Sequence, residues 1–173
     1  ILEIQSRTYK EQYGDNFITI IPTNIYGEND NFNLNDAHVV PALIHKCFLC
    51  KKNNDHFTIK GTGKPLRQFI YSKDLAKLIL WTLFNYKDSK PIILAPNEDE
   101  EISIKNVALH IANSMNYKND ILFDSSYSDG QYKKTASNKK LLNLLPNFKF
   151  TPFSIGIKET INWFENNYPN VRK

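Results

Sequence analysis

A chain of 173 residues has the length of one domain or of a large part of one. Its 41% hydrophobic and 23% charged residues are those of a globular protein, and its longest apolar runs fall short of the ~18 residues that would span a membrane. The net charge of +4 suits a small anionic ligand, but basic and acidic residues are interleaved, which argues against a nucleic-acid-binding surface.

The first predicted element is a helix over residues 1–13, ended by Gly14, the residue favoured just past a helix C-terminus. Because the chain opens inside this helical pattern, without methionine or a secretory leader, we expect a piece of a longer protein. Residues 16–22, NFITIIP, predict a parallel-sheet strand buried on both faces. A long polar loop is expected over residues 23–38.

The next predicted element is a helix over residues 41–51, which contains the C-x-x-C pair Cys47 and Cys50. Such a pair can indicate zinc or redox chemistry. Helical spacing instead places both cysteines on one face as small hydrophobes, and the sequence offers no second pair of ligands. We therefore expect no metal site, and two unpaired thiols fit a reducing compartment such as the cytoplasm.

Helix and strand patterns alternate through the remainder of the chain. Strands are expected over 56–61, 91–95 and 120–124, and helices over 73–86, 98–115 and 138–145, with Ser72 and Ser103 capping the first two helices. Thr151 and Pro152 open a final helix, with the proline at its first position. This alternation indicates an α/β protein. Residues 86–90, YKDSK, match a Tyr-x-x-x-Lys pattern, but they fall in a linker, and we interpret the match as coincidence.

Ligands of open α/β sheets bind beyond the carboxyl ends of the strands. Thr23 and Asn24 follow the most apolar strand, so they are a candidate ligand edge, although a plain turn around Gly27 explains them equally well. His38 lies where a helix begins. A helix N-terminus disfavours the imidazolium and suits proton transfer near neutrality, and the alternative is a histidine that bonds only locally.

The stretch GTGKPLRQFIYSKDL, residues 61–75, is a candidate phosphate-binding turn. Gly61 and Gly63 allow a tight turn and a close approach to a ligand, and Pro65 stiffens it. The guanidinium of Arg67 can pair two phosphate oxygens at once, which a lysine cannot do. The alternative is a surface arginine paired with Asp74.

Six segments together resemble the C-terminal half of the GDP-L-fucose synthases, which belong to the extended short-chain dehydrogenase/reductase family. They are IIPTNIYGENDNFN, HVVPALIHK, GTGKPLRQFIYSKDLA, PIILA, SDGQYKKTASNKKL and FTPF. The resemblance covers residues 1–173. It implies the C-terminal part of an extended Rossmann-type, doubly wound α/β fold plus a small mixed α/β substrate-binding domain. Residues 1–30 would end the dinucleotide-binding domain, and residues 31–173 would form the substrate-binding region, with some elements packing back on the Rossmann sheet.

The resemblance also implies roles for individual residues. The segment that would border the nicotinamide of NADPH is Pro22, Thr23, Asn24 and Ile25. His38 would contact the cofactor and act as the proton donor or acceptor in epimerisation. The residues that would hold the GDP-sugar are Lys46, Lys60, Arg67 and Asp129. Lys60 departs from the family pattern, which usually has a tryptophan at this position.

The activity implied for the complete enzyme is conversion of GDP-4-keto-6-deoxy-D-mannose to GDP-L-fucose with NADPH. The family's Gly-rich loop, serine, reactive cysteine and Tyr-x-x-x-Lys pair would precede Ile1, so we expect the isolated fragment to be inactive. The full-length enzyme is expected to be a cytoplasmic homodimer with no nucleic-acid or membrane partner. Two alternatives are a non-catalytic nucleotide-sugar-binding module and an epimerase or dehydratase acting on another nucleotide sugar.

Overall fold

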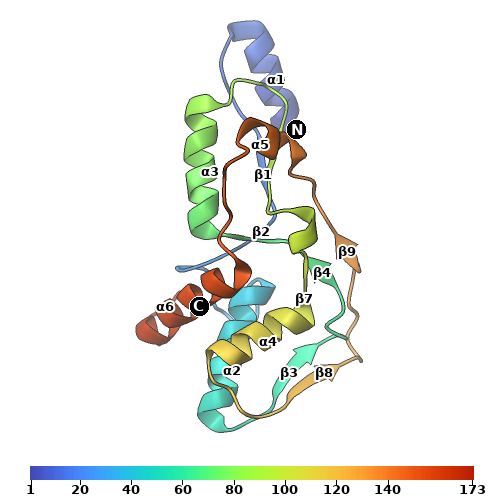
Figure 1. Cartoon of the computed structure of the whole chain (residues 1–173), viewed down its shortest axis with the longest axis vertical. Helices are drawn as coiled ribbons and strands as arrows, with labels where there is room; N and C mark the ends of the chain where they lie inside the picture. Colours follow the sequence, from blue (N-terminus) through green and yellow to red (C-terminus); the bar gives the residue numbers. More distant parts are fainter.

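In the computed structural model, which describes residues 1–173, short strands alternate with helices (Figure 1). The helices are α1 (Leu2–Tyr13), α2 (Val39–Asn53), α3 (Ser72–Asn85), α4 (Ile104–Ser114), α5 (Lys139–Leu144) and α6 (Phe153–Asn167), with one 3-10 turn, η1 (Glu98–Glu100). The strands are β1 (Ile20–Pro22), β2 (Asn24–Tyr26), β3 (Phe57–Lys60), β4 (Leu66–Arg67), β5 (Phe69–Tyr71), β6 (Ile92–Leu94), β7 (Ile102–Ser103), β8 (Ile121–Asp124) and β9 (Lys133–Lys134).

The strands form four small sheets, and most of their pairings are parallel. β1 pairs with β6, β2 with β5 and β3 with β8, each in parallel register. In the fourth sheet, β4 lies between β7, which is antiparallel to it, and β9, which is parallel to it. Parallel neighbours need crossover connections, and here helices supply several of them. The α/β class predicted from the sequence is confirmed.

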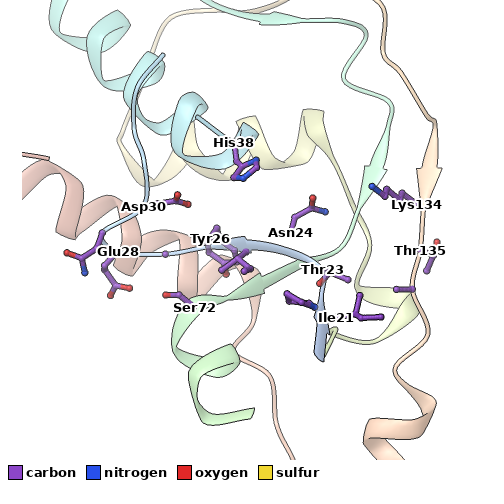
Figure 2. A pocket seen from close by; sticks show the side chains of 15 residues that line it. Ile21, Thr23, Asn24, Tyr26, Glu28, Asp30, His38, Ser72, Lys134 and Thr135 are labelled. Atoms are coloured by element: carbon purple, nitrogen blue, oxygen red, sulfur yellow. The ribbon is translucent and has the colours of Figure 1, made fainter. Parts of the chain in front are cut away.

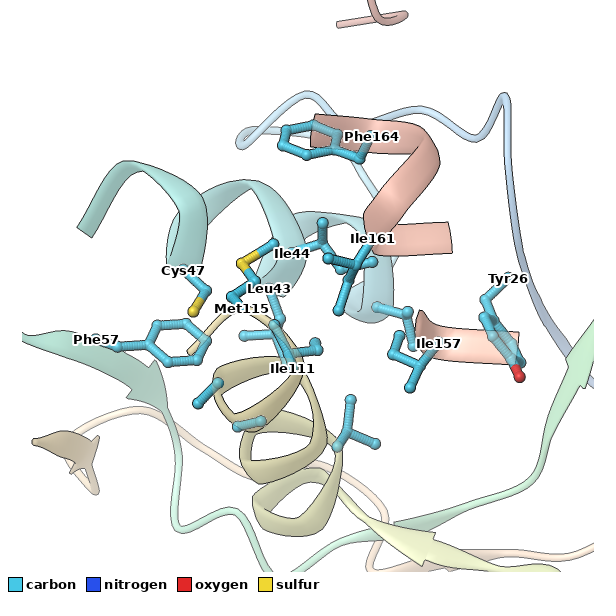
Figure 3. Close-up of a cluster of buried hydrophobic side chains, with 14 of the residues drawn as sticks. Tyr26, Leu43, Ile44, Cys47, Phe57, Ile111, Met115, Ile157, Ile161 and Phe164 are labelled. Carbon is cyan, nitrogen blue, oxygen red and sulfur yellow. The ribbon is translucent and has the colours of Figure 1, made fainter. Parts of the chain in front are cut away.

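Two hydrophobic cores divide the molecule. The larger core lies between α2, α4 and α6 and includes Ile44, Ile111 and Phe164, whose side chains converge in Figure 3. The smaller core is built by Ile70, Leu75, Leu78, Tyr86, Ile92, Leu94 and Leu141. In Figure 1 the helices α1, α3 and α5 surround the upper part, and β2 crosses toward the helices of the lower part. Residues 20–26, where the ligand edge was predicted, therefore run from the smaller core to the larger one.

Several local predictions are confirmed. Gly14 ends α1 in the left-handed conformation, at φ 77°. Ser103 caps α4, its hydroxyl accepting from the backbone N–H of Asn106 at 3.1 Å. Residues 86–90 lie outside any helix, after α3 has ended at Asn85. Cys47 and Cys50 are both buried in the larger core, as their spacing on one helix face predicted.

Two predictions about the segment from residue 16 to residue 38 are wrong. β1 is not buried on both faces, since Ile21 remains 46% exposed, and β6 is its only neighbouring strand. The predicted loop contains β2, because Asn24–Tyr26 pairs with Phe69–Tyr71, far along the chain. That partner is a tertiary feature, and the local sequence carries no sign of it.

Two helix starts also differ from prediction. Ser72 is the first residue of α3 and not its cap, because β5 runs directly into the helix and leaves Tyr71 at the cap position. Pro152 was expected at the first position of the last helix, but it is the N-cap of α6, which begins at Phe153. None of the helices combines the length and the apolar character needed to cross a membrane.

Candidate active site

A cavity of about 720 Å³ opens at the carboxyl end of β1. Its lining comprises residues 21–30, His38, Ser72 and residues 134–136. The volume falls in the range of pockets that hold small organic ligands, about 300–1,000 Å³. Figure 2 shows His38 and Asn24 on one side of it, with Lys134 of β9 and Thr135, just after β9, beyond them. The cavity thus joins four separate parts of the sequence.

The wall formed by residues 21–25 combines apolar and polar groups. Ile21 and Ile25 are 46% and 41% exposed, which is unusual for isoleucines that line a cavity. The hydroxyl of Thr23 is buried and has no hydrogen-bond partner within the protein. The side-chain amide of Asn24 donates to the backbone carbonyl of Gln68 at 2.8 Å, which fixes its orientation. This wall offers exposed apolar side chains and one polar atom without a hydrogen-bond partner.

Gly27 allows the wall to turn close to α3. Its φ is 157°, and a Cβ at this position would lie 2.0 Å from the hydroxyl oxygen of Ser72. A side chain at this position would therefore require Ser72 to move. The turn directs residues 28–30 back along the cavity.

Glu28 anchors the following turn through a network of charged groups. Its carboxylate lies 2.6 Å from the ammonium of Lys73 and 2.8 Å from the hydroxyl of Tyr71. Glu159 of α6 contacts the same two groups, at 3.0 Å and 2.8 Å. Burial acts to raise the pKa of Glu28, but the hydrogen bonds from Lys73 and Tyr71 prevail and lower it. The carboxylate is therefore held ionised, and the turn is tied to α3 and α6.

His38 occupies the N-cap position of α2, with φ −64° and ψ 164°. Its side chain makes no capping hydrogen bond and is exposed to the cavity. Asp30, on the same side of the cavity, is half-buried (Figure 2). Burial raises the pKa of the Asp30 carboxyl, and the nearby imidazole of His38 opposes this shift. The arrangement leaves the imidazole free to exchange a proton with a bound molecule.

The structure brings five of the nine predicted site residues together at this cavity. They are Pro22, Thr23, Asn24, Ile25 and His38. The other four, Lys46, Lys60, Arg67 and Asp129, do not line it. Their assigned roles stay predictions.

Arg67 lies next to the cavity on β4. It pairs in register with Lys134 of β9, and paired residues of neighbouring parallel strands project to the same face of a sheet. Its Nη1 donates to the carbonyls of Leu66, at 2.7 Å, and Tyr132, at 3.4 Å, and its other guanidinium nitrogens have no protein acceptor. The alternative pairing with Asp74 is wrong, because that carboxylate accepts instead from Lys77 and the backbone of Thr151.

The remaining three predicted residues have different surroundings. Lys46 is half-buried on α2 and makes no hydrogen bond or ion pair. The ammonium of Lys60 lies 4.8 Å from the centre of the Tyr127 ring. Asp129 accepts from the backbone N–H of Thr62 at 2.7 Å and from its hydroxyl at 2.5 Å.

Sequence reasoning missed several polar residues of the lining, among them Glu28, Asp30 and Lys134. Lys134 belongs to the segment SDGQYKKTASNKKL, but no spacing rule distinguishes it from the neighbouring lysines. Only its pairing with Arg67 shows that the two cations stand side by side. His45, by contrast, is a structural residue, since its Nδ1 lies 2.7 Å from the carbonyl of Phe32 in the larger core.

Comparison with known proteins supports this description of the fold. Residues 1–95 match the model of the NAD dependent epimerase/dehydratase family. GDP-L-fucose synthase of Dictyostelium discoideum is 54% identical over 173 residues, which are 100% of this chain and 54% of that protein. The probable GDP-L-fucose synthase of Drosophila melanogaster is 40% identical over 180 residues, covering 100% of this chain and 56% of that protein. The chain therefore spans about half the length of these relatives.

Solved structures of similar proteins also superpose on nearly the whole of this chain. A GDP-L-fucose synthetase from Naegleria fowleri, also solved bound to NADP, superposes with a TM-score of 0.96 at 46% identity. The match covers 99% of this chain and 54% of the first of those structures, and 53% of the NADP-bound one. A GDP-6-OMe-4-keto-L-xylo-heptose reductase from C. jejuni superposes with a TM-score of 0.82 at 25% identity, over 95% of this chain and 58% of that one.

Proposed function

This chain belongs to the NAD dependent epimerase/dehydratase family, and from that premise we propose that it is part of an NADPH-dependent enzyme that converts GDP-4-keto-6-deoxy-D-mannose to GDP-L-fucose. The observation that carries the proposal is the cavity in which residues 22–25, His38 and Lys134 meet. The similarity to GDP-L-fucose synthases along the whole chain supports the same substrate.

The residues of the cavity wall fit a nicotinamide cofactor. A nicotinamide ring is flat and apolar with one amide, and the wall presents exposed isoleucines beside the unpartnered hydroxyl of Thr23. A buried hydroxyl without a partner costs about 1–3 kcal/mol, which a ligand's polar group would recover. Pro22, Thr23, Asn24 and Ile25 would hold the ring, and the bound NADPH would supply the hydride that reduces the 4-keto group.

His38 would carry the proton chemistry of epimerisation. The 4-keto group acidifies the protons at C3 and C5 of the sugar, so a base can remove each proton and an acid can return it on the opposite face. His38 projects from the start of α2 into the cavity without a protein partner of its own. It can therefore accept and return a proton without breaking an existing hydrogen bond.

The diphosphate of the substrate would lie along β4 and β9. Arg67 and Lys134 stand side by side there, and no protein carboxylate pairs with either of them. A guanidinium and an ammonium suit a diphosphate, which carries several negative oxygens. Lys46, Lys60 and Asp129 would complete the contacts to the nucleotide sugar. With residues 1–30 assigned to the cofactor domain and 31–173 to the substrate region, the cavity lies at their junction.

The proposal extends to the setting of the enzyme. We place the complete protein in the cytoplasm, where its two unpaired thiols remain reduced. We propose a homodimer, since α1 presents Leu2, Ile4, Tyr9 and Tyr13 to solvent and buries none of its residues.

The test uses the protein at its natural length. Mixed with GDP-4-keto-6-deoxy-D-mannose, it should oxidise NADPH and release GDP-L-fucose. Binding of GDP-mannose without NADPH oxidation would support the non-catalytic module instead. Tighter binding of UDP than of GDP would support an enzyme acting on another nucleotide sugar. Residues 1–173 alone should bind GDP but oxidise no NADPH.

A further inference from the structure

Gln68 lies directly behind the candidate active site and is completely buried, with 0% of its surface exposed. Its Nε2 lies within hydrogen-bond distance of three carbonyl oxygens, those of Ala136 at 3.0 Å, Pro96 at 3.1 Å and Asn97 at 3.3 Å. Its Oε1 accepts from the backbone N–H of Ala136 at 2.8 Å. Every polar atom of the side chain is therefore engaged.

These contacts join segments that lie far apart in the sequence. Ala136 follows β9 and lines the cavity, whereas Pro96 and Asn97 follow β6. On the other side, the backbone carbonyl of Gln68 accepts from the side chain of Asn24, which belongs to the opposite wall. A single residue thus contacts both walls of the cavity, one through its side chain and one through its backbone.

A neighbouring buried amide extends the same connection. Asn138 is 4% exposed, and its Nδ2 donates to the carbonyl of Ala95 and to Oδ1 of Asn97, both at 3.1 Å. The loop after β6 is thereby held to the segment after β9 at two points. The wall that contains Lys134 has no strand partner beyond β4, so these side chains replace the hydrogen bonds that a longer sheet would provide.

We propose that Gln68 is a positioning residue that sets the separation between Asn24 and Lys134, and through it the affinity for an anionic nucleotide sugar. The effect on affinity for a nucleotide sugar rests on the proposed function. A buried amide is costly unless all its hydrogen bonds are made, and an apolar side chain would fill the same space more cheaply. The amide at this position therefore has a geometric role, because small displacements of a charged ligand-binding group reduce binding strongly.

The experiment compares Gln68→Met and Gln68→Glu with the wild-type protein at its natural length. Methionine matches the length of glutamine but removes all four hydrogen-bond contacts of the side-chain amide, which go to Ala136, Pro96 and Asn97. We expect Kd for GDP-mannose and KM for the substrate to rise about tenfold, with kcat at saturation changed by less than about twofold. Glutamate keeps an acceptor for the N–H of Ala136 but places a buried carboxylate oxygen against three carbonyl oxygens, so its Kd should rise at least as much.

Thr82→Val is the matched control. Thr82 is 2% exposed, and its hydroxyl bonds only within α3, to the carbonyl of Leu78. This variant should lower Tm without changing Kd or KM. Amide hydrogen exchange gives a readout that needs no ligand, since the N–H of Ala136 should exchange faster in Gln68→Met and be unchanged in Thr82→Val.

Each outcome decides the inference. An unchanged Kd in Gln68→Met, or a fall in kcat with KM unchanged, would overturn it. If Gln68→Met does not fold, Gln68→Glu decides, and a wild-type Kd in that variant contradicts the proposal. If the wild-type protein itself binds no GDP-mannose, the proposed function fails, and the positioning role is then judged by the exchange of Ala136 alone.

Discussion

The carboxylate of Asp129 clamps Thr62, accepting from its backbone N–H at 2.7 Å and from its hydroxyl at 2.5 Å. The loop before β9 is thereby fastened to the Gly61–Gly63 turn. Sequence reasoning assigned Asp129 to the GDP-sugar. Its observed contacts add a role in holding the loop that leads to Lys134.

The clamp should be lost in acid. The side-chain and backbone hydrogen bonds from Thr62 lower the pKa of Asp129 below its ordinary value, about 3.9. Because the pKa of Asp129 is lower in the folded state, the contact stabilises the fold fully at pH values above the pKa of the unfolded chain. This contribution is lost as pH falls through the pKa of the folded state. The amide NMR signal of Thr62 should therefore shift between about pH 4 and pH 2. Asp129→Asn removes the titrating group, and the same transition in that variant would refute the assignment.

Removing the guanidinium of Arg67 should weaken nucleotide binding. Charge-assisted hydrogen bonds contribute about 1.5–3 kcal/mol each, so Arg67→Ala should raise Kd for GDP by at least about tenfold in calorimetric titration. Arg67→Lys should recover only part of the affinity, because an ammonium cannot pair two phosphate oxygens in a fork. Lys77→Ala is the control, since Lys77 is an exposed cation whose partner, Asp74, is on α3. Equal affinity in Arg67→Ala and wild type would exclude a phosphate contact.

Replacement of His38 should affect proton transfer more than nucleotide binding. In His38→Asn we expect the uptake of solvent deuterium at C3 and C5 of the substrate to slow by about 10²–10⁴-fold, the usual contribution of a general acid or base. Proton NMR in D₂O measures this exchange. His56→Asn serves as the control, because His56 is exposed and lies outside the cavity. Normal deuterium uptake in His38→Asn would assign the chemistry to another residue.

The turn that contains Gly63 should not tolerate a side chain. Gly63 has φ 73°, and a Cβ there would lie 2.4 Å from a ring carbon of Phe123. Gly63→Ala combines backbone strain with this clash and should lower the free energy of unfolding by about 2–4 kcal/mol. Gly130→Ala has a similar φ, 67°, but open space around it, and should cost only about 1 kcal/mol. Urea unfolding of both variants tests the difference, and equal losses would show that the clash contributes nothing.

The thiol of Cys47 should be unreactive in the folded protein. Burial raises its pKa to about 12, and its side chain faces Phe57 in the larger core (Figure 3). At pH 8 only about one thiol in 10⁴ would be ionised, and no reagent can reach it. Mass spectrometry after N-ethylmaleimide treatment should find Cys47 unmodified until urea unfolds the chain. Rapid modification under native conditions would indicate a core that opens readily.

The sequence alone determined the α/β class and most of the helices, because helical periodicity, caps and glycine stops act over a few neighbouring residues. It also pointed to Thr23, Asn24 and His38 as candidates, since the end of an apolar strand and the start of a helix are local signals. The resemblance supplied the remaining assignments.

Only the tertiary structure decided what these elements meet. The pairing of β2 with β5, the neighbouring positions of Arg67 and Lys134, and the contacts of Gln68 with both cavity walls join residues at least 40 positions apart. Short strands with few distinctive residues do not specify their partners, so register and the resulting cavity depend on packing throughout the chain. For the same reason, the sequence left open a pairing of Arg67 with Asp74, whose carboxylate in the structure accepts from Lys77 and from the backbone of Thr151.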